Sequence, residues 1–585
     1  MLNLDHEDFP NCRPKMEWMR DNWETHACYS ELGVDGSECS SFVYLSQIEQ
    51  HCPPAFPSHS NIPPASVIQS RKLEELLLLL SDSEVNYNFI KSRITRLFPK
   101  WIQGINELQK SIPNLWNRPR LNLILYLGFL SHETGLKFGE KSTTGGPLGE
   151  MVQWADLITS VFILGHNVSI SSEWNSFKTK ADEYENQGPC PRLDGKQIDL
   201  IFTDIMGLRR IKRKKKNFFS SNKCKFRMLD SFGTHAEFNS NAYFKAHSSQ
   251  IGGKNAWGGH ELALQQFLTM YPHTDDNTFL GFVVETYDFH ETVARENITV
   301  VYGKEKYMWK DSEPILQIAA NYTQIHATVA DSDEIMPAFH VTNHHLLTGE
   351  KFHRLLRGSK IFLGLGFPLE GPAPLEAVAN GAIFINPRFS PPKSRKTYKF
   401  FGDKPTLREL HSQNPYMERF IGAPYVFTVD IFNQNELHQA FQSALKTNVT
   451  PYLPFEWSFL GMIERVDVIL HKHNFCNLHS TWPPFEAASL EVASSGVSCQ
   501  DFCASKGFVC ERSFFSKINN EDILSRFSSC NGGFSRASVT YAPAICLLQN
   551  DSMLFSCATV PPKEIKRNVI SRQKCPPASL LTRIF

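Results

Sequence analysis

The chain has 585 residues, long enough for about three to four domains with separate cores. Apolar residues make up 42% of it and aromatic residues 12%, which excludes general disorder. The 60 basic and 60 acidic residues give a formal net charge of zero, so bulk charge indicates neither nucleic acid nor an anionic membrane as a partner. No apolar run is long enough to span a bilayer, and the first residues lack the basic and apolar regions of a signal peptide.

Cysteines gather at the two ends of the chain. Four lie in the first 52 residues and eight after residue 475, with only Cys190 and Cys224 between them. This distribution predicts disulfide-rich flanks on a large core; zinc is the alternative, although no CxxC occurs. Five N-x-S/T sequons also favour a lumenal or secreted location, and their asparagines are Asn167, Asn297, Asn321, Asn448 and Asn550. The missing export signal then suggests a fragment or a chain without its first exon.

Two series of apolar runs separated by helical patterns occupy the centre of the chain. A proline-rich stretch at 53–64 reads as a linker, and residues 73–118 have helical periodicity. The runs expected as strands are 121–130, 161–165, 198–203 and 279–285, then 298–303, 325–329, 360–365, 382–386 and 425–429. Helices are expected at about 434–446 and 455–474. Continuous apolar strands alternating with helices indicate parallel sheets covered on both faces, and therefore two α/β lobes with a cleft between them.

The segment 364–377, Gly-Leu-Gly-Phe-Pro-Leu-Glu-Gly-Pro-Ala-Pro-Leu-Glu-Ala, follows one of these strands and enters a helical pattern. Backbone N–H groups at a helix start suit phosphate. Glu370 and Glu376 frame the segment, and an ionised carboxylate accepts hydrogen bonds from a ribose diol. The pattern predicts a site for a nucleotide-linked substrate, with an ordinary strand-loop-helix crossover as the alternative.

A second glycine-rich loop runs from Gly145 into a helical pattern that carries Glu150 in its first turn. A glutamate beside a loop that lets a substrate approach the backbone can serve as a general base. The alternative is a glutamate that only complements the helix dipole.

Two charged stretches have weaker functional interpretations. Asp331-Ser332-Asp333 has the spacing of a D-x-D metal site, but it lies in an acidic loop that continues into Glu334, and a solvated turn is the favoured interpretation. Residues 209–216 carry seven cations in eight positions and suit either a heparin-like polyanion or a solvated loop. No HExxH, G-x-S-x-G or P-loop is present, so metalloprotease, serine hydrolase and P-loop kinase functions lack support.

Several long motifs in order resemble one known family. They are G-G-P-L-G-E-x-V-Q-W at 145–154, L-D-S-F-G-T at 229–234, Y-P-H-T-x-D-N-x-F-L-G-F-V-V-E at 271–285, V-Y-G-K at 301–304, the segment at 364–377 and G-D-K-P-T-L-R-E-L at 402–410. The chain resembles the α-1,6-mannosylglycoprotein 6-β-N-acetylglucosaminyltransferase (N-acetylglucosaminyltransferase V) family over roughly residues 10–560. It departs from that family at both ends, where the membrane anchor, much of the stem and the terminal cysteine-rich segment are missing.

The resemblance implies a GT-B fold, with two Rossmann-like lobes facing a cleft, and an inverting transfer of GlcNAc from UDP-GlcNAc in β1,6 linkage to the α1,6-arm mannose of N-glycans. It implies no metal and no further cofactor, and a Golgi-lumenal or secreted location with membrane contact only through the missing anchor. The implied domains are a Cys-rich stem-side segment 1–66, an acceptor-binding lobe 67–290, a donor-binding lobe 291–475 and a Cys-rich region 476–585.

Site residues follow from the matched motifs. Glu150 is the implied catalytic base. The implied acceptor-binding residues are Asp230, Ser231, Phe232, Trp257 and Lys404, the last of these on the donor lobe. The implied donor-binding residues are Glu370, Gly371 and Glu376, with Lys304 and Asn343 suggested by position alone.

Two other functions stay open at this point. One is a paralogue that acts on O-mannosyl glycans. The other is a catalytically silent, secreted heparin-binding protein, which the basic stretch at 209–216 and the missing anchor favour and the intact Glu150, Glu376 and Lys404 oppose.

Overall fold

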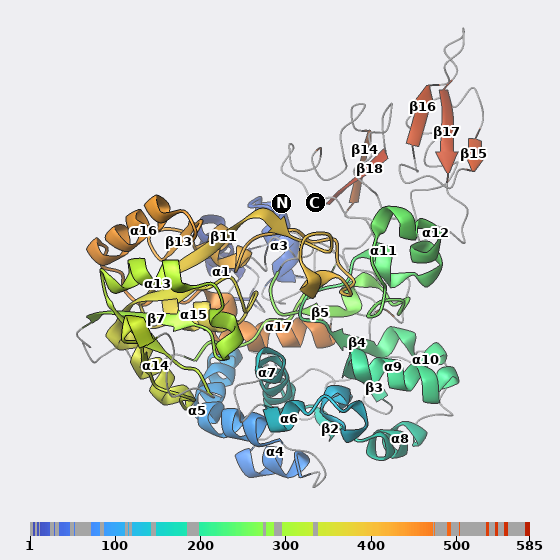
Figure 1. Ribbon diagram of the computed structural model, residues 1–585. Helices are drawn as coiled ribbons and strands as arrows, with labels where there is room; N and C mark the ends of the chain where they lie inside the picture. Colours follow the sequence, from blue (N-terminus) through green and yellow to red (C-terminus); the bar gives the residue numbers. More distant parts are fainter. Residues whose placement is uncertain are drawn as a thin grey trace. The chain divides into compact units, whose positions relative to one another are not determined.

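The computed structural model is shown in Figure 1. It describes 72–81, 87–111, 115, 120–141, 148–183, 198–272, 277–285, 295–330 and 337–471, with 4, 5, 7, 9, 10, 12–23, 29, 34–46 and 52 before them and 473, 475, 488–492, 502, 534–536, 544–547, 555–559 and 580–584 after them. The chain forms two compact units. One consists of Met1–Asn61, Thr234–Leu264 and Val468–Phe585, and the other of Ile62–Gly233 and Gln265–Asp467. Both α/β lobes belong to the second unit.

The first lobe is built on a parallel six-stranded sheet. Its strands are β1 (Asn122–Tyr126), β2 (Asn167–Ser171), β3 (Ile198–Asp204), β4 (Phe226–Leu229), β5 (Phe267–Thr269) and β6 (Thr278–Phe279). They lie in the order β2-β1-β3-β4-β5-β6. Every residue of β3 is buried, as expected of a strand covered on both faces. The strand order reverses between β1 and β3, so ligand sites are expected at their carboxyl ends.

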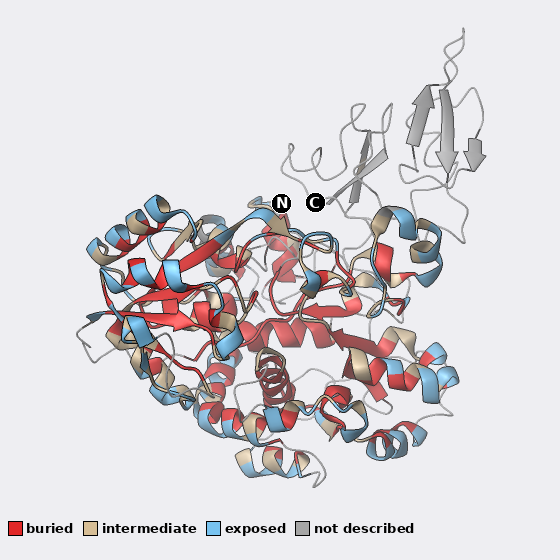
Figure 2. Cartoon of the chain, viewed as in Figure 1, coloured by how far each residue is buried: buried red, intermediate tan, exposed pale blue. Residues whose placement is uncertain are grey.

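Helices of the first lobe are α4 (Leu73–Leu79), α5 (Asn88–Ser111), α6 (Phe138–Lys141), α7 (Gly149–Ile163), α8 (Trp174–Asp182), α9 (Ile205–Lys214) and α10 (Lys216–Ser221). The prediction of a strand at 161–165 is wrong, because Val161 to Ile163 form the last turn of α7. Residues 151–163 of α7 are all buried (Figure 2). A helix that is buried on all sides lacks a clear apolar stripe, so a short apolar run within it cannot be distinguished from a buried strand by its periodicity.

The second lobe has a seven-stranded sheet. Its strands are β7 (Glu296–Tyr302), β8 (Gln324–Ala327), β9 (Thr342–Asn343), β10 (Ser359–Gly364), β11 (Ile383–Lys393), β12 (Leu410–Ser412) and β13 (Val426–Val429). The parallel strands follow the order β9-β8-β7-β10-β11-β13, and β12 joins β11 antiparallel. This is the doubly wound order of dinucleotide-binding folds, and its switch point lies between β7 and β10.

Helices of the second lobe are α13 (Glu313–Ala320), α14 (Gly349–Gly358), α15 (Ala373–Ala379) and α16 (Gln434–Lys446). The following helix, α17 (Phe459–His471), packs against the first lobe, where Phe459 lies edge-on to Trp101 at 5.0 Å and Arg465 Nε donates to Leu280 O at 2.9 Å. One buried cluster joins α13 and α16 to the sheet through Leu316, Ile361 and Phe441. The strand expected at 279–285 is limited to Thr278–Phe279. The two parallel α/β sheets confirm the predicted GT-B class of fold.

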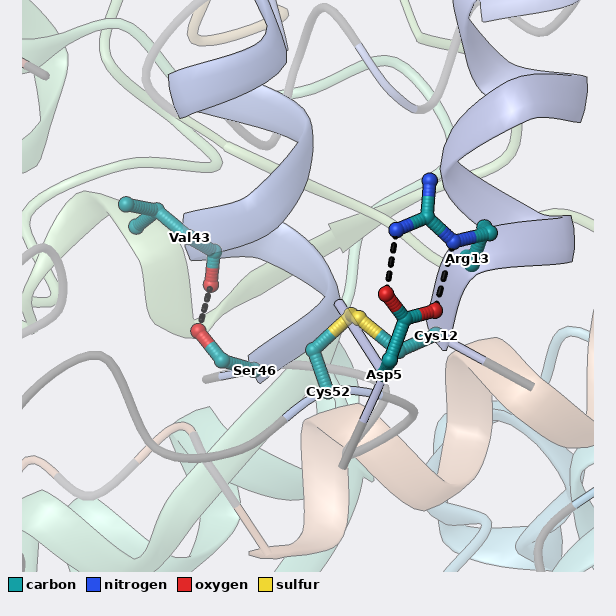
Figure 3. Close-up of a disulfide and its surroundings, with 6 residues drawn as sticks. All are labelled: Asp5, Cys12, Arg13, Val43, Ser46 and Cys52. Carbon is teal, nitrogen blue, oxygen red and sulfur yellow. Dashed lines mark hydrogen bonds and ion pairs between the residues drawn. A yellow bond between two sulfur atoms is a disulfide. The ribbon is translucent and has the colours of Figure 1, made fainter. Parts of the chain in front are cut away.

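In the first compact unit, α1 (Cys12–Asn22) and α3 (Glu38–Tyr44) are accompanied by the Cys12–Cys52 disulfide. Figure 3 shows this bridge beside the Asp5–Arg13 ion pair and the 3.1 Å hydrogen bond from the Ser46 hydroxyl to the Val43 carbonyl. The same unit contains α11 (Ala236–Asn239) and α12 (Asn241–Ile251), the strand pair β14 (Ala488–Val492) and β18 (Leu580–Ile584), and the strands β15 (Phe534–Arg536), β16 (Ala544–Leu547) and β17 (Phe555–Thr559).

Within the described part of the flanks, Cys12–Cys52 is the one disulfide, so the predicted disulfide-rich character has limited support. Cys224, in the first lobe, is also disulfide-bonded, whereas Cys190 lies outside the described residues. Among the helices that the structure describes, none combines the length and the apolar character needed to cross a bilayer.

Candidate active site

The first candidate residue, Glu150, lies in the first turn of α7, directly after Leu148 and Gly149. The preceding residues 145–147 lie outside the described part. Burial raises the pKa of Glu150, while its backbone hydrogen bonding and the charge of Lys404 act in the opposite direction. A carboxylate with a raised pKa has the higher proton affinity that a general base requires.

Lys404 comes from the second lobe, three residues after a short 3-10 turn at Lys399–Phe401. Its Nζ lies 4.4 Å from the ring centroid of Phe232 and 4.1 Å from that of Phe400. Burial lowers the pKa of Lys404, and the carboxylates of Glu150, Asp230 and Asp403 oppose this shift. The structure therefore brings Glu150, Asp230, Phe232 and Lys404 together, although they come from both lobes.

The turn Asp230–Gly233 follows β4 at the carboxyl edge of the first sheet. It closes with a 3.1 Å hydrogen bond from Gly233 N to Asp230 O, and Asp230 N donates to Leu268 O at 2.8 Å. The Phe232 ring then packs edge-on against Phe400 at 5.3 Å between centroids. This contact joins the predicted acceptor turn, which includes Ser231, to an aromatic cluster of the second lobe.

Trp257, the fifth predicted acceptor residue, belongs to the segment Thr234–Leu264 of the first compact unit. Its carbonyl oxygen lies 2.9 Å from Nε2 of His260. The predicted lobe 67–290 is thus interrupted by an insertion between β4 and β5 that groups with the ends of the chain.

The predicted donor loop follows β10 and is held by Gln413. The Gln413 Oε1 accepts from Gly366 N at 2.8 Å, its Nε2 donates to Pro368 O at 2.8 Å, and its carbonyl accepts from Glu370 N at 3.0 Å. Lys393 adds a 2.6 Å hydrogen bond to the Gly366 carbonyl. The N–H groups of Gly366 and Glu370 are therefore engaged within the protein, so they do not form part of an open phosphate cradle.

Glu370 is also engaged by its side chain. Arg408 donates to both carboxylate oxygens, at 2.7 Å from Nη1 to Oε2 and through Nη2 to Oε1. Both side chains are almost fully buried. Glu370 has a positive φ of 49°, an unusual conformation for a residue with a side chain, and this ion pair together with Gln413 holds it there. Both oxygens of the Glu370 carboxylate are thus engaged by Arg408 in the structure, and the donor-binding role of Glu370 stays a prediction.

Gly371 lies between two tyrosines. A Cβ at this position would overlap the hydroxyl oxygen of Tyr302, so only glycine fits. The Tyr271 hydroxyl donates to the Gly371 carbonyl at 2.8 Å and accepts from Asn414 at 3.3 Å. Because Pro372 and Pro374 have no N–H, the backbone donors between 371 and 374 are those of Gly371 and Ala373.

Glu376 lies in α15 and Lys304 follows β7, so the two flank the switch point of the second sheet. Burial lowers the pKa of Lys304, and the Glu376 carboxylate opposes this shift. Asn343 has a different environment: its Oδ1 accepts from Val329 N at 2.9 Å and its Nδ2 donates to Val329 O at 3.0 Å. The amide of Asn343 is thus used to hold the loop after β8.

The start of α7 and the start of α15 lie against each other. A Cβ built on Gly149 would lie 3.8 Å from Cδ of Pro372, with Met270 beside them. Glu150 and the donor loop are therefore neighbours, which allows one substrate to contact both.

The remaining sequence predictions concern the surface. In the basic stretch, Arg210 is buried and donates to Tyr126 and Ser131, Lys214 pairs with Glu133, and Lys215 pairs with Asp182. These contacts engage part of the positive charge that was predicted to bind a polyanion. The sequon residues Asn167, Asn297, Asn321 and Asn448 are all exposed, whereas Asn550 lies outside the described residues, as do Asp331 and Asp333.

Two doubly wound lobes that bring the start of a helix of one, with the partly buried Glu150 in its first turn, beside the switch-point loop of the other have the arrangement of GT-B glycosyltransferases. The chain matches the family model "Glycosyltransferase family 18" over residues 28–570, and it belongs to this family.

Named relatives agree. The alpha-1,6-mannosylglycoprotein 6-beta-N-acetylglucosaminyltransferase of Caenorhabditis elegans is 41% identical over 582 residues, covering 96% of this chain and 85% of the relative. The alpha-1,6-mannosylglycoprotein 6-beta-N-acetylglucosaminyltransferase A of Homo sapiens is 39% identical over 574 residues, covering 95% of this chain and 77% of the relative. The alpha-1,6-mannosylglycoprotein 6-beta-N-acetylglucosaminyltransferase B of Homo sapiens is 37% identical over 610 residues, covering 94% of this chain and 76% of the relative. The chain is therefore a glycosyltransferase.

Several residues that shape the site were not singled out from the sequence. Gln413 carries no motif signal, because its role depends on contacts with a loop some 45 residues away. The quoted motifs do contain Tyr271, Tyr302 and Arg408. They mark these residues as part of the resemblance but do not indicate what each side chain contacts. Lys393 has no such signal, and it lies over the rings of Phe389 and Tyr398 at 4.0 and 4.3 Å.

Proposed function

We propose that this chain transfers N-acetylglucosamine from UDP-N-acetylglucosamine, in β1,6 linkage and with inversion, to the α1,6-arm mannose of N-glycans. The names of relatives about 40% identical over 95% of the chain support the reaction and the acceptor. The observation that carries the proposal is the contact between the start of α7, which bears Glu150, and the start of α15, which bears Glu376.

In the proposed reaction, Glu150 removes the proton from the mannose 6-hydroxyl as its oxygen attacks C1 of the sugar donor. An alcohol needs such a base near neutral pH because its own pKa lies far above 7. The bond between C1 and the UDP oxygen breaks on the opposite face, so one displacement inverts the configuration. Lys404 would keep Glu150 ionised before the attack, since its cation favours the carboxylate form.

Asp230, Ser231 and Phe232 would bind the acceptor. Phe232 offers an aromatic face beside Lys404, and the turn that contains it is fixed by its own hydrogen bonds. Trp257 is retained as an acceptor residue on the strength of its motif alone.

On the donor side, Glu376 would accept hydrogen bonds from the ribose hydroxyls, and Gly371 lets the diphosphate approach the backbone. The backbone N–H groups of Gly371 and Ala373, with the cation of Lys304, would balance the charge of the leaving diphosphate. No metal or other cofactor is part of this proposal.

A Golgi-lumenal or secreted location fits the Cys12–Cys52 disulfide, because such bonds persist in oxidising compartments. N-glycosylation of the exposed sequons belongs to the same proposal.

The decisive experiment incubates the protein with UDP-GlcNAc and a biantennary N-glycan, or with a matched O-mannosyl glycan, and identifies the linkage by mass spectrometry and NMR. We expect β1,6 transfer to the N-glycan. Glu150→Gln keeps the size of the side chain and should lower turnover by at least about 100-fold while UDP binding stays unchanged. Transfer to the O-mannosyl glycan alone would assign the chain to the paralogue, and turnover of Glu150→Gln near the parental value would remove Glu150 from the mechanism.

A further inference from the structure

A buried polar network centred on His353 lies behind the donor helix α15. His353 belongs to α14 and is 2% exposed. Its Nδ1 lies 2.8 Å from Nδ2 of Asn380, the C-cap residue of α15, and its Nε2 lies 3.7 Å from Oε2 of Glu285. The imidazole thus stands between the end of the donor helix and the segment that leads from the first sheet toward β7.

The contacts define one tautomer of His353. Asn380 Nδ2 also donates to Glu376 O at 2.7 Å, and an amide nitrogen can only donate, so His353 Nδ1 accepts. A rotated Asn380 amide would place its oxygen against the Glu376 carbonyl oxygen. The proton of the imidazole is therefore on Nε2, facing the Glu285 carboxylate. Burial lowers the pKa of His353, which keeps the ring neutral against the opposing influence of Glu376 and Glu285.

Glu285 is fixed from its other side by α5. Arg96 Nε lies 3.1 Å from both carboxylate oxygens of Glu285. Together, Arg96, Glu285, His353 and Asn380 form a continuous chain of contacts from α5 to the end of α15.

The same helix α5 holds the helix that bears Glu150. Arg93 donates to the Asp156 carboxylate of α7 at 2.9 and 2.8 Å and to the Val283 carbonyl at 2.7 Å. Val283 N in turn donates to Asp156 at 2.7 Å. The segment 283–285 therefore connects the proposed base-bearing helix and the proposed donor helix through buried side chains.

We propose that His353 is a positioning residue for the donor: by accepting from Asn380 and facing Glu285, it fixes α15, and with it Glu376, relative to the segment 283–285. This inference rests on the proposed donor role of Glu376. Loss of the bond between His353 and Asn380 should let α15 shift, so the affinity for UDP should fall while the acceptor turn at 230–233 is unaffected.

The test compares three substitutions at one position. His353→Leu removes both polar contacts. His353→Asn keeps an acceptor near the Nδ1 position, and His353→Gln keeps an N–H donor near the Nε2 position. We expect His353→Leu and His353→Gln to weaken UDP binding about tenfold in calorimetry, the size of one buried hydrogen bond, whereas His353→Asn stays within about threefold of the parent. The KM for the acceptor should not change.

The matched control is His438→Leu on α16, where Nδ1 lies 2.9 Å from the Tyr322 hydroxyl in the same lobe. It removes a hydrogen bond of similar length from a partly exposed imidazole and should leave UDP affinity unchanged. An equal loss of affinity in the control would mean that the effect is general destabilisation. Parental UDP affinity in His353→Leu, or equal rescue by Gln and Asn, would also overturn the proposal.

Hydrogen exchange of the ligand-free protein separates this inference from the proposed function. We expect faster exchange at residues 373–380 in His353→Leu than in the parent or in His438→Leu. Unchanged exchange there would overturn the positioning role whatever the protein binds. Faster exchange in a protein whose parent does not bind UDP would leave the mechanical link intact and reject the proposed donor site.

Discussion

The Tyr271 hydroxyl donates a 2.8 Å hydrogen bond to the carbonyl oxygen of Gly371, which joins a motif of the first lobe to the donor loop of the second. The two residues are 100 positions apart in the chain. Tyr271 is fully buried, whereas Gly371 is partly exposed, and burial raises the pKa of Tyr271 well above its ordinary value. A neutral hydroxyl therefore fixes the backbone at the point where Gly371 is proposed to admit the donor.

Tyr271→Phe tests this contact. The substitution removes the hydroxyl that donates to the Gly371 carbonyl and accepts from the buried Asn414 amide, so the free energy of unfolding should fall by about 1–3 kcal/mol. UDP affinity should fall as well, because the loop is then less ordered. Urea unfolding and calorimetry measure the two effects. Parental values for both would show that Gly371 needs no support from the first lobe.

Gly371→Ala should be destabilising because the added Cβ would overlap the Tyr302 hydroxyl. Overpacking of this kind costs about 1–3 kcal/mol. The next tyrosine atom, Cζ, would lie 3.4 Å from the new methyl group, so Tyr302→Phe should relieve the overlap. We expect the double variant to be more stable than Gly371→Ala alone in urea unfolding. Additive losses in this double-mutant cycle would contradict the steric explanation.

Glu370 and Glu376 should respond differently to substitution, although they belong to one motif. Glu370→Gln breaks a buried ion pair with Arg408 and should lower stability by about 3–5 kcal/mol. Glu376→Ala should change stability little and weaken the binding of both UDP and UDP-GlcNAc by about 1.5–3 kcal/mol, since the ribose is common to both. Thermal unfolding and calorimetry on both variants check this contrast. Unchanged UDP binding in Glu376→Ala would reject the ribose role.

The pH dependence of turnover should report the Glu150–Lys404 pair. Burial raises the pKa of Glu150 from its ordinary value of 4.5, and a base works only when ionised, so turnover should fall with decreasing pH at a higher pH than an ordinary glutamate would give. Lys404 favours the ionised form. Lys404→Met should therefore move this acid limb to higher pH, whereas Lys404→Arg keeps the charge and should move it less. If the acid limb does not move in Lys404→Met, Lys404 does not influence the protonation of the catalytic base.

Chelation tests the proposed metal-free mechanism. With Lys304 and backbone N–H groups balancing the diphosphate charge, EDTA should leave turnover intact. Asp331→Ala combined with Asp333→Ala should also be nearly neutral. Loss of transfer in EDTA that manganese restores would require a metal in the mechanism.

Much of the fold could be predicted because its strands are continuous apolar runs. β3, β7 and β10 appeared close to their predicted bounds, since a strand buried on both faces needs such a run. The prediction at 161–165 was wrong for the same reason: α7 is also buried on all sides, and hydrophobicity without periodicity does not distinguish the two. Strand order depends on pairings between distant segments, so the switch point between β7 and β10 became visible only in the structure.

The sequence by itself determined which chemical groups are available: the motifs containing Glu150, Lys404 and Glu376, and the helix start after β10. The tertiary structure alone decided what each group does locally. It placed Lys404 beside Glu150 and paired Glu370 with Arg408. It also bound the Asn343 amide to the backbone of Val329 and the Gln413 side chain to the donor loop. A motif specifies side-chain chemistry, whereas pairing and burial depend on contacts between residues far apart in the chain, and these determine which carboxylate remains available to a substrate.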